Sequence, residues 1–383
     1  MCAFSGPAIS ASCKVRYRRS TLMTGGDYAR LLEEETVRGI ARLLSKTSYA
    51  SILKDVNLEA VRRSELESHL SFAIFQEAES FRPYLSASSR KLLELWFESF
   101  DIVLFKLRFR SRFGGGMTGG FEEKEEGLDE AEILNLLSEY RLTLVDQKKL
   151  FAAQTPREFV EAVNNERLRQ SLLEALLQNG EEERFPSGET FQKLSFAFGT
   201  ILDQQYYNAL FVAGGHLPGA EGSLVQRLIG TRVDLLNLYW IYRGRRFFCM
   251  SPEQALTLVT RVRYRLNFDF LSRVAFAPLE SWPELLAQTP YAVVFGAKDS
   301  GELREIEMVR NLCRVLAQTA STLFMSGTMG FHHVVSYLNL KEFEVRDLIA
   351  VIEAVRYGFN REKIGSLLIQ PLGGEASYGM EEV

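Results

Sequence analysis

The spacing of apolar residues along this chain is helical almost throughout. Between residues 27 and 44 apolar side chains return every three or four positions, which is the pattern of an amphipathic helix. Similar stripes run through residues 66–78 and from about residue 88 to 112. Strict alternation of apolar and polar residues, which is typical of strands, is scarce. The pattern predicts an all-α protein.

Glycine, proline and capping residues divide the helices from one another. Residues 114–127 are rich in glycine and then in acids, and this composition predicts a surface loop, after which helix restarts at Leu128. Thr155 followed by Pro156, and Ser251 followed by Pro252, predict two helix starts. In each pair a hydroxyl can cap the first turn and proline fits the first helical position.

One helical segment recurs three times along the chain. Its copies cover residues 100–110, 232–243 and 337–348, and each carries an acid followed three positions later by Asn, Asp or Leu. A repeated unit must bury its apolar face against a neighbour. The recurrence therefore predicts three pseudo-symmetric helical repeats that together form a funnel or triangular cup.

A second signature accompanies the first. Residues 43–49 (LLSKTSY) resemble residues 285–291 (LLAQTPY), and residues 151–156 look like a third version. Each of these elements is expected to precede one acid-bearing helix. The expected repeats are residues 14–127, with the glycine-rich and acidic loop at the end, 128–250 and 251–370, with flexible termini at 1–13 and 371–383.

Composition narrows the class of protein. The chain has 383 residues, of which 25% are charged and 46% hydrophobic, as in ordinary soluble proteins. A net charge of -4 argues against a dedicated nucleic-acid binder. Four cysteines lie far apart and no CxxC spacing occurs, which favours reduced thiols in a cytosolic protein. We find no signal peptide and no run of roughly 18–20 apolar residues that would span a bilayer.

The acids of the repeated helix are the first candidates for chemistry. Asp234 and Asn237 lie three residues apart and share one face of a helix that looks buried. They are either a catalytic carboxylate with an orienting amide or a polar latch that binds backbone ends or an arginine of the next repeat. Related pairs at Asp101/Leu104 and Glu344/Asp347 favour the latch, because a catalytic pair needs no copies. The predicted latch residues are Asp101, Asp234, Asn237, Glu344 and Asp347.

Other motifs do not support catalysis. Gly114, Gly116 and Gly119 form GxGxxG, but the motif follows a helix and precedes acids that would repel phosphate. Adjacent His332 and His333 point to different sides of a helix, so a shared metal site is not expected, and His69 and His216 have no acid or Cys partner at metal-ligand spacing. We therefore predict no catalytic residues, no metal site and no cofactor.

Arginines beside aromatic residues end the middle copy of the repeat. In one interpretation they only cap the helix, which would end at Gly244 and has a dipole that favours cations there. In the other they also contact a partner, such as an anionic surface or an acidic helix. The predicted partner-binding residues are Arg243, Arg245, Arg246 and Phe247.

Taken in order, these residues resemble the C subunit of the bacterial and archaeal V/A-type ATPases, which is equivalent to the d subunit of the eukaryotic vacuolar ATPase. The middle copy with Arg243 is the strongest match, whereas Leu104 and Asp347 stand where the family pattern has Asn. The resemblance covers residues 15–369 and is carried by residues 14–19, 27–32, Phe100, Asp101, Lys106, 233–238, Arg243, Tyr337, Leu338, Lys341, Glu342, Glu344 and Ile364.

The resemblance implies a non-catalytic rotor subunit of the central stalk. It would lie on the cytoplasmic face of the membrane, one copy per complex, between the proteolipid rotor ring and the subunits of the central axle, and would transmit torque. Two other functions stay open from the residues alone. An unrelated α-helical scaffold would stack its repeats along an axis, and a helical hydrolase would need a pocket with a perturbed acid or base.

Overall fold

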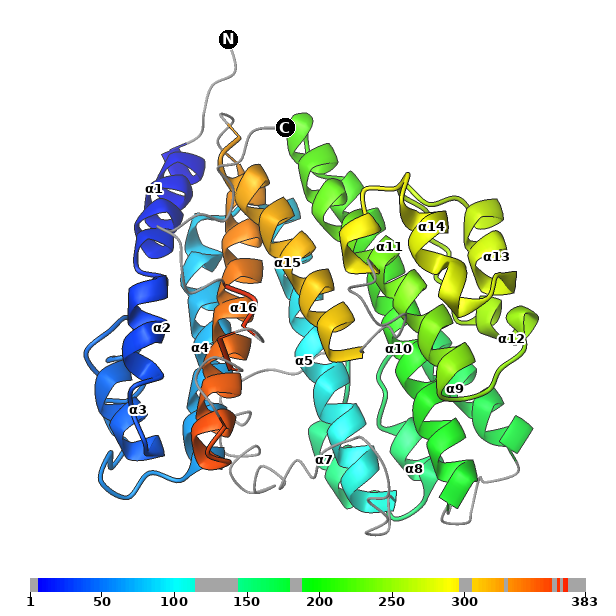
Figure 1. The fold of residues 1–383 in the computed structure, drawn as a ribbon, viewed down its shortest axis with the longest axis horizontal. Helices are drawn as coiled ribbons and strands as arrows, with labels where there is room; N and C mark the ends of the chain where they lie inside the picture. Colours follow the sequence, from blue (N-terminus) through cyan, green and yellow to red (C-terminus); the bar gives the residue numbers. More distant parts are fainter. Residues whose placement is uncertain are drawn as a thin grey trace. The chain divides into compact units, whose positions relative to one another are not determined.

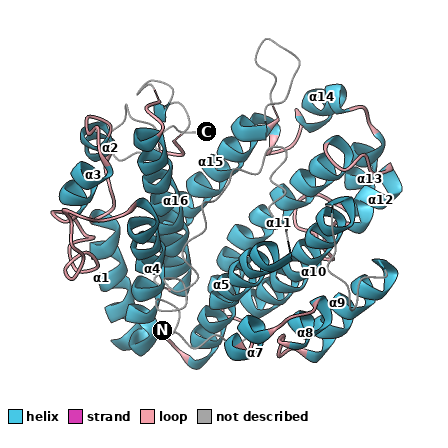
Figure 2. Ribbon diagram, turned by 90° about the horizontal axis from the view of Figure 1, so that it is seen from below, coloured by secondary structure: helices cyan, strands magenta, loops and turns pink. Residues whose placement is uncertain are grey.

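The computed structural model describes residues 6–113, 144–179, 188–295, 305–326, 330–359, 364–365 and 368–370. Regular structure in these residues is helical, and Figure 2 draws helices and loops without a strand among them. The one strand-like contact in this part of the chain is an isolated antiparallel bridge between Val145 and Val163. The prediction of an all-α protein is confirmed. The chain divides into two compact units.

The first unit contains residues 1–90, 214–259 and 263–383. Its central element is α16, which packs against α1, α4, α11 and α15. Figure 1 shows α16 between α4 and α15. Of the 26 residues of α16, 19 are buried, so this helix is enclosed on nearly all sides. The elements are α1 (Gly6–Ser20), α2 (Gly25–Leu31), α3 (Val37–Leu44), α4 (Arg63–Phe81), η1 (Arg82–Tyr84), α11 (Ala220–Arg246), α12 (Pro252–Thr257), α13 (Phe268–Phe276), η2 (Leu279–Ser281), α14 (Trp282–Leu286), η3 (Ala292–Val294), α15 (Glu305–Phe324) and α16 (Phe331–Arg356).

The second unit contains residues 91–213 and 260–262. Its core is aromatic: the rings of Phe105 and Phe159 lie 4.6 Å apart, and those of Phe109 and Phe198 lie 5.0 Å apart. Such edge and tilted contacts add to the free energy gained from burial. Its helices are α7 (Gln147–Ala152), α8 (Pro156–Glu161) and α9 (Glu166–Asn179), with most of α5 (Ala87–Phe113) and of α10 (Gly188–Gly215).

Several predicted helix boundaries agree with the structure. The stripe predicted from about residue 88 to 112 is α5. Thr155 caps α8 by accepting the amide of Glu158 at 3.2 Å, and Ser251 caps α12 by accepting the amide of Gln254 at 3.3 Å. The stripe from 27 to 44 is divided into α2 and α3, because Thr36 accepts the Gly39 amide at 3.1 Å and starts a new helix.

Gly244 does not end its helix, contrary to the capping interpretation, because α11 continues to Arg246. A Cβ atom at position 244 would lie 2.9 Å from Cδ1 of Leu258. The glycine therefore serves the close approach of the segment that follows α12.

Some predictions fall outside this description or remain untested. The loop at 114–127 and the helix restart at Leu128 lie outside the described residues. Residues 6–13, predicted as part of a flexible terminus, form the first half of α1. The repeat boundaries at 127/128 and 250/251 stay predictions. No helix in the described ranges combines the length and the apolar character that crossing a bilayer requires.

Candidate functional site

Asp234 lies in the middle of α11 and its side chain is fully buried. Its carboxylate accepts the backbone amides of Tyr264 at 3.4 Å, Arg265 at 2.8 Å and Leu266 at 3.3 Å. The hydroxyl of Tyr291 donates to the same carboxylate at 2.9 Å. One acid thus binds α11 to the segment before α13 and to the segment after α14.

Gly230 makes this contact sterically possible. It lies one turn before Asp234 on α11, and a Cβ atom there would be 2.4 Å from Cγ of Tyr264. The tyrosine ring therefore packs directly on the helix backbone, which brings the amides of residues 264–266 within reach of the carboxylate.

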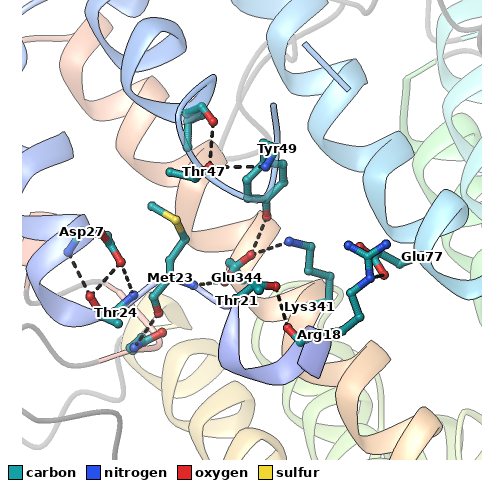
Figure 3. Close-up of polar contacts among 12 residues, drawn as sticks. Arg18, Thr21, Met23, Thr24, Asp27, Thr47, Tyr49, Glu77, Lys341 and Glu344 are labelled. Carbon is teal, nitrogen blue, oxygen red and sulfur yellow. Dashed lines mark hydrogen bonds and ion pairs between the residues drawn. The ribbon is translucent and has the colours of Figure 1, made fainter. Parts of the chain in front are cut away.

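Glu344 forms the corresponding site on α16, shown in Figure 3. Its carboxylate accepts the Met23 amide at 2.5 Å, the Tyr49 hydroxyl at 2.7 Å and the Lys341 ammonium at 2.7 Å. Lys341 is only 3% exposed, and its Nζ lies 3.8 Å from the centre of the Tyr49 ring. A buried cation and a buried anion are therefore paired with each other and with the N-terminal segment.

The segments that bind the two carboxylates are built alike. Met23 and Tyr49 are 26 residues apart, and so are Arg265 and Tyr291. Two α-helices separate the amide from the tyrosine in each case: α2 and α3 in the first segment, and α13 and the short α14, with η2 between them, in the second. The Thr47 hydroxyl donates to the Leu44 carbonyl at 2.7 Å, and the Thr289 hydroxyl donates to the Leu286 carbonyl at 2.8 Å.

Residues 43–49 and 285–291 each precede an acid-bearing helix in the sequence, as predicted, but neither binds the acid of that helix. Tyr291 binds Asp234 of the helix before it. Tyr49, near the start of the chain, binds Glu344 of the last long helix, 295 residues away. The N-terminal segment therefore completes a site that belongs to α16.

Residues 151–156 do not form a third copy of the turn seen at Thr47 and Thr289. The Thr155 hydroxyl caps α8 instead of bonding back to the preceding helix. The first acid does bind a following segment, since Asp101 is 2% exposed and accepts the Leu144 amide at 2.6 Å.

Two further predicted latch residues are buried. Asp347 accepts the amides of Ile369 at 2.8 Å and Gln370 at 2.9 Å, and the Gln370 side chain donates to the Met23 carbonyl at 3.1 Å. Glu344 therefore connects α16 to the segment between α1 and α2, and Asp347 connects it to residues 369 and 370. Asn237 is fully buried one turn after Asp234.

Burial shifts the pKa values of these acids and of the tyrosines that bind them. Removal from water raises the pKa of Asp234, against the lowering effect of the three amides and the Tyr291 hydroxyl. Burial raises the pKa of Asp347 to about 6, although two amides favour its ionised form. Burial and the neighbouring acid also raise the pKa values of Tyr49 and Tyr291. These tyrosines therefore stay protonated and act as hydrogen-bond donors.

The arginines predicted to bind a partner have different surroundings. Arg245 donates to the carbonyl of Ala275 at 2.7 Å and to that of Ala277, so it caps the end of α13. Arg243 lies 3.4 Å from the Glu305 carboxylate and above the Tyr239 ring. Arg246 and Phe247 are exposed.

Several donors to the buried acids are not among the predicted latch residues. Lys341, Tyr49 and Tyr291 all lie in the recurring motifs, and the tyrosine shared by residues 43–49 and 285–291 could have identified two of them from the sequence. The Met23 amide has no sequence signal of this kind, because every residue except proline offers the same donor.

His332 and His333 are buried at the start of α16, and His332 pairs with the Ser326 hydroxyl at 2.8 Å. In the described ranges no three His, Cys, Asp or Glu side chains are arranged to hold a metal ion.

These observations define an all-helical protein in which buried acids bind the chain's own amides, tyrosines and a lysine. The chain belongs to the ATP synthase (C/AC39) subunit family, whose model matches residues 11–367. It is 21% identical over 364 residues to the C subunit of the A-type ATP synthase of Methanosarcina barkeri, covering 94% of this chain and 92% of that protein. The corresponding C subunit of Methanocaldococcus jannaschii is 22% identical over 369 residues, covering 95% and 86%.

Proposed function

We propose that this chain is a non-catalytic central-stalk subunit of a rotary A/V-type ATPase. It would join the cytoplasmic axle to the proteolipid ring in the membrane and transmit torque between ATP chemistry and ion transport. The observation that carries the proposal is the family match, which extends from residue 11 to residue 367. The relatives are named as the C subunit of an A-type ATP synthase and are matched over most of their length.

The arrangement of buried acids fits a part that must resist deformation. Close-packed helices transmit strain, and hydrogen-bonded acids between helices fix their register. Asp234, Glu344 and Asp347 each bind a segment distant from their own helix, and Asp101 binds the amide of Leu144. With Asn237, we propose these residues as latches inside three helical repeats related by rotation about one axis, in a funnel. The equal 26-residue spacing in two of the segments supports the repeat.

Co-purification tests the proposal. Tagged full-length chain is isolated from detergent-solubilised membranes of its own cells, and the proteins that accompany it are identified. We expect axle subunits and the proteolipid ring in the same particle, attached at the cytoplasmic face. Recovery with neither, or with an unrelated helical assembly, would show that the chain is a scaffold of another kind.

Coupling gives a second measurement. Cells that lack the chain should keep ATP hydrolysis by the detached catalytic part and lose ATP-driven ion transport. Full-length chain should restore transport. Loss of hydrolysis itself, with no rescue of transport by the chain, would contradict a torque-transmitting role.

A further inference from the structure

The helix α13 exposes two phenylalanines beside several arginines. It buries Leu271, Val274 and Ala275, while Phe268 is 50% exposed and Phe276 is 54% exposed. These two residues begin and end α13, and the exposed Arg273 lies between them in the sequence. Exposed apolar surface with a polar rim is a feature of interaction sites.

The arginines around α13 are held against aromatic rings. The guanidinium of Arg263 lies 5.6 Å from the Phe268 ring, that of Arg265 lies 5.7 Å from the Tyr264 ring, and that of Arg273 lies 5.3 Å from the Phe270 ring. Arg265 and Arg273 are exposed. Stacking on a ring restricts a long side chain before any partner arrives, which reduces the entropy lost on binding.

This surface is continuous with the end of α11. Arg245 binds the carbonyls of Ala275 and Ala277, so the last turn of α11 is fixed beside the last turn of α13. Arg246 and Phe247 follow directly, and Phe247 is 46% exposed. We define the α13 surface by its exposed residues, Arg246, Phe247, Arg265, Phe268, Arg273 and Phe276.

The choice of cation indicates the class of partner. Nine arginines and no lysine occur between Lys193 and Lys298. Attraction to an anionic membrane depends on charge and uses lysine as readily as arginine. Arginine with aromatic residues and without lysine is the composition of protein interfaces, where the guanidinium binds a carboxylate through two parallel hydrogen bonds.

We propose that the α13 surface docks a helix of another protein subunit, one that presents Asp or Glu residues beside an apolar stripe. The carboxylates pair with Arg265, Arg273 and Arg246, and the apolar stripe covers Phe268 and Phe276. The exposed Asp269 lies within this surface and disfavours carboxylates directly opposite it. The expectation that this subunit is part of the ATPase rests on the proposed function.

A cross-link from Phe276 identifies the partner. Full-length chain with photoreactive benzoylphenylalanine at position 276 is irradiated in the purified complex, and the linked peptide is identified by mass spectrometry. We expect a helical peptide of another subunit with at least one carboxylate in each turn. A link to residues 114–143 of this chain, or to phospholipid alone, would overturn the proposal.

Charge reversal tests the energetic role of the arginines. We expect Arg246→Glu with Arg273→Glu to reduce recovery of the cross-linked subunit about tenfold at moderate salt, with the melting temperature recorded as the check on folding. The control is Arg110→Glu with Arg157→Glu, which changes the net charge by the same amount but on the second unit. It should leave recovery of the cross-linked subunit unchanged. Equal recovery with both double variants would reject the α13 surface. Absence of the wild-type chain from the ATPase would instead reject the proposed function, while an acidic-helix cross-link would still support this inference.

Discussion

Asp234 and Glu344 occupy corresponding sites on two helices but obtain their hydrogen bonds differently. Asp234 accepts three backbone amides and a tyrosine hydroxyl. Glu344 accepts one amide and one tyrosine hydroxyl, and its third donor is Lys341 on the same helix. A buried carboxylate needs a full set of donors. At Glu344 the bound segment supplies only one amide, and the Lys341 ammonium provides the further donor.

The residue three positions before each acid reflects this difference. It is Lys341 before Glu344, Thr231 before Asp234, and Glu98 before Asp101. Burial, together with the charge of Asp101, raises the pKa of Glu98 to about 7. The same helical position therefore holds a cation, a neutral hydroxyl and an acid that takes up a proton near neutral pH.

The largest expected effect comes from Glu344→Gln. The amide oxygen of glutamine still accepts hydrogen bonds, but the buried Lys341 loses its anion, and a buried unpaired charge destabilises by about 3–5 kcal/mol. Chemical denaturation measures the loss. The double variant Lys341→Met with Glu344→Gln removes the cation as well and should recover most of the stability. Equal midpoints for the single and the double variant would contradict a pairing role for Lys341.

The acid pair on α5 predicts a pH dependence. The folded pKa of Glu98 is about 7, above its ordinary value of 4.5, so the folded state binds this proton more tightly. Unfolding free energy should therefore fall as the pH rises from about 4.5 to about 7, by at most about 3 kcal/mol. Glu98→Gln should make the unfolding free energy nearly independent of pH in this range. Glu94→Gln, on the exposed side of α5, should leave the pH dependence unchanged. An unchanged slope in Glu98→Gln would refute the assignment.

Asp234→Ala should destabilise the first unit by roughly 1–3 kcal/mol, because the amides of residues 264–266 and the Tyr291 hydroxyl lose their acceptor. Asp234→Asn should cost less, since an oxygen acceptor remains and no buried lysine depends on the charge. Asp234→Asn is therefore expected to destabilise the protein less than Glu344→Gln. Thermal melting that is unchanged in Asp234→Ala would count against the latch.

Gly230→Ala tests the close approach of Tyr264. Alanine favours a helix by up to about 1 kcal/mol over glycine, yet its Cβ would meet the Tyr264 ring, so we expect net destabilisation of about 1–2 kcal/mol. Gly199→Ala on α10 is the matched control, because its nearest neighbour, Cε of Lys106, is at an ordinary 3.5 Å. A more stable Gly230→Ala protein would show that the ring is free to move away.

The smallest effects compare the two tyrosines. Tyr49→Phe and Tyr291→Phe each remove one hydroxyl donor to a carboxylate, and each should cost about 1 kcal/mol. Similar values from denaturation would support equivalent roles at the two sites. A cost confined to one of them would show that the corresponding segments are alike in geometry and not in energy.

The helices, their caps and the buried acids can be predicted from the sequence, because they follow from periodicity and local chemistry. The pairing of Met23 with Glu344 cannot, since backbone amides carry no residue signature and 321 positions separate the two. The sequence predicts that residues 151–156 match residues 43–49, because Thr155 stands in a short pattern like that of Thr47. The same pattern also occurs at helix starts, and Thr155 caps α8. Gly244 looks like a helix end in the sequence, while its actual reason, contact with Leu258, depends on tertiary packing.

The bond between Met23 and Glu344 has a consequence for synthesis of the chain. Translation proceeds at about 5–20 residues per second, so residue 23 leaves the ribosome roughly 15–60 s before its acceptor has been made. During that interval α2 and α3 have no docking site on α16. A chaperone that shields the nascent N-terminus would therefore be needed most before the last long helix emerges.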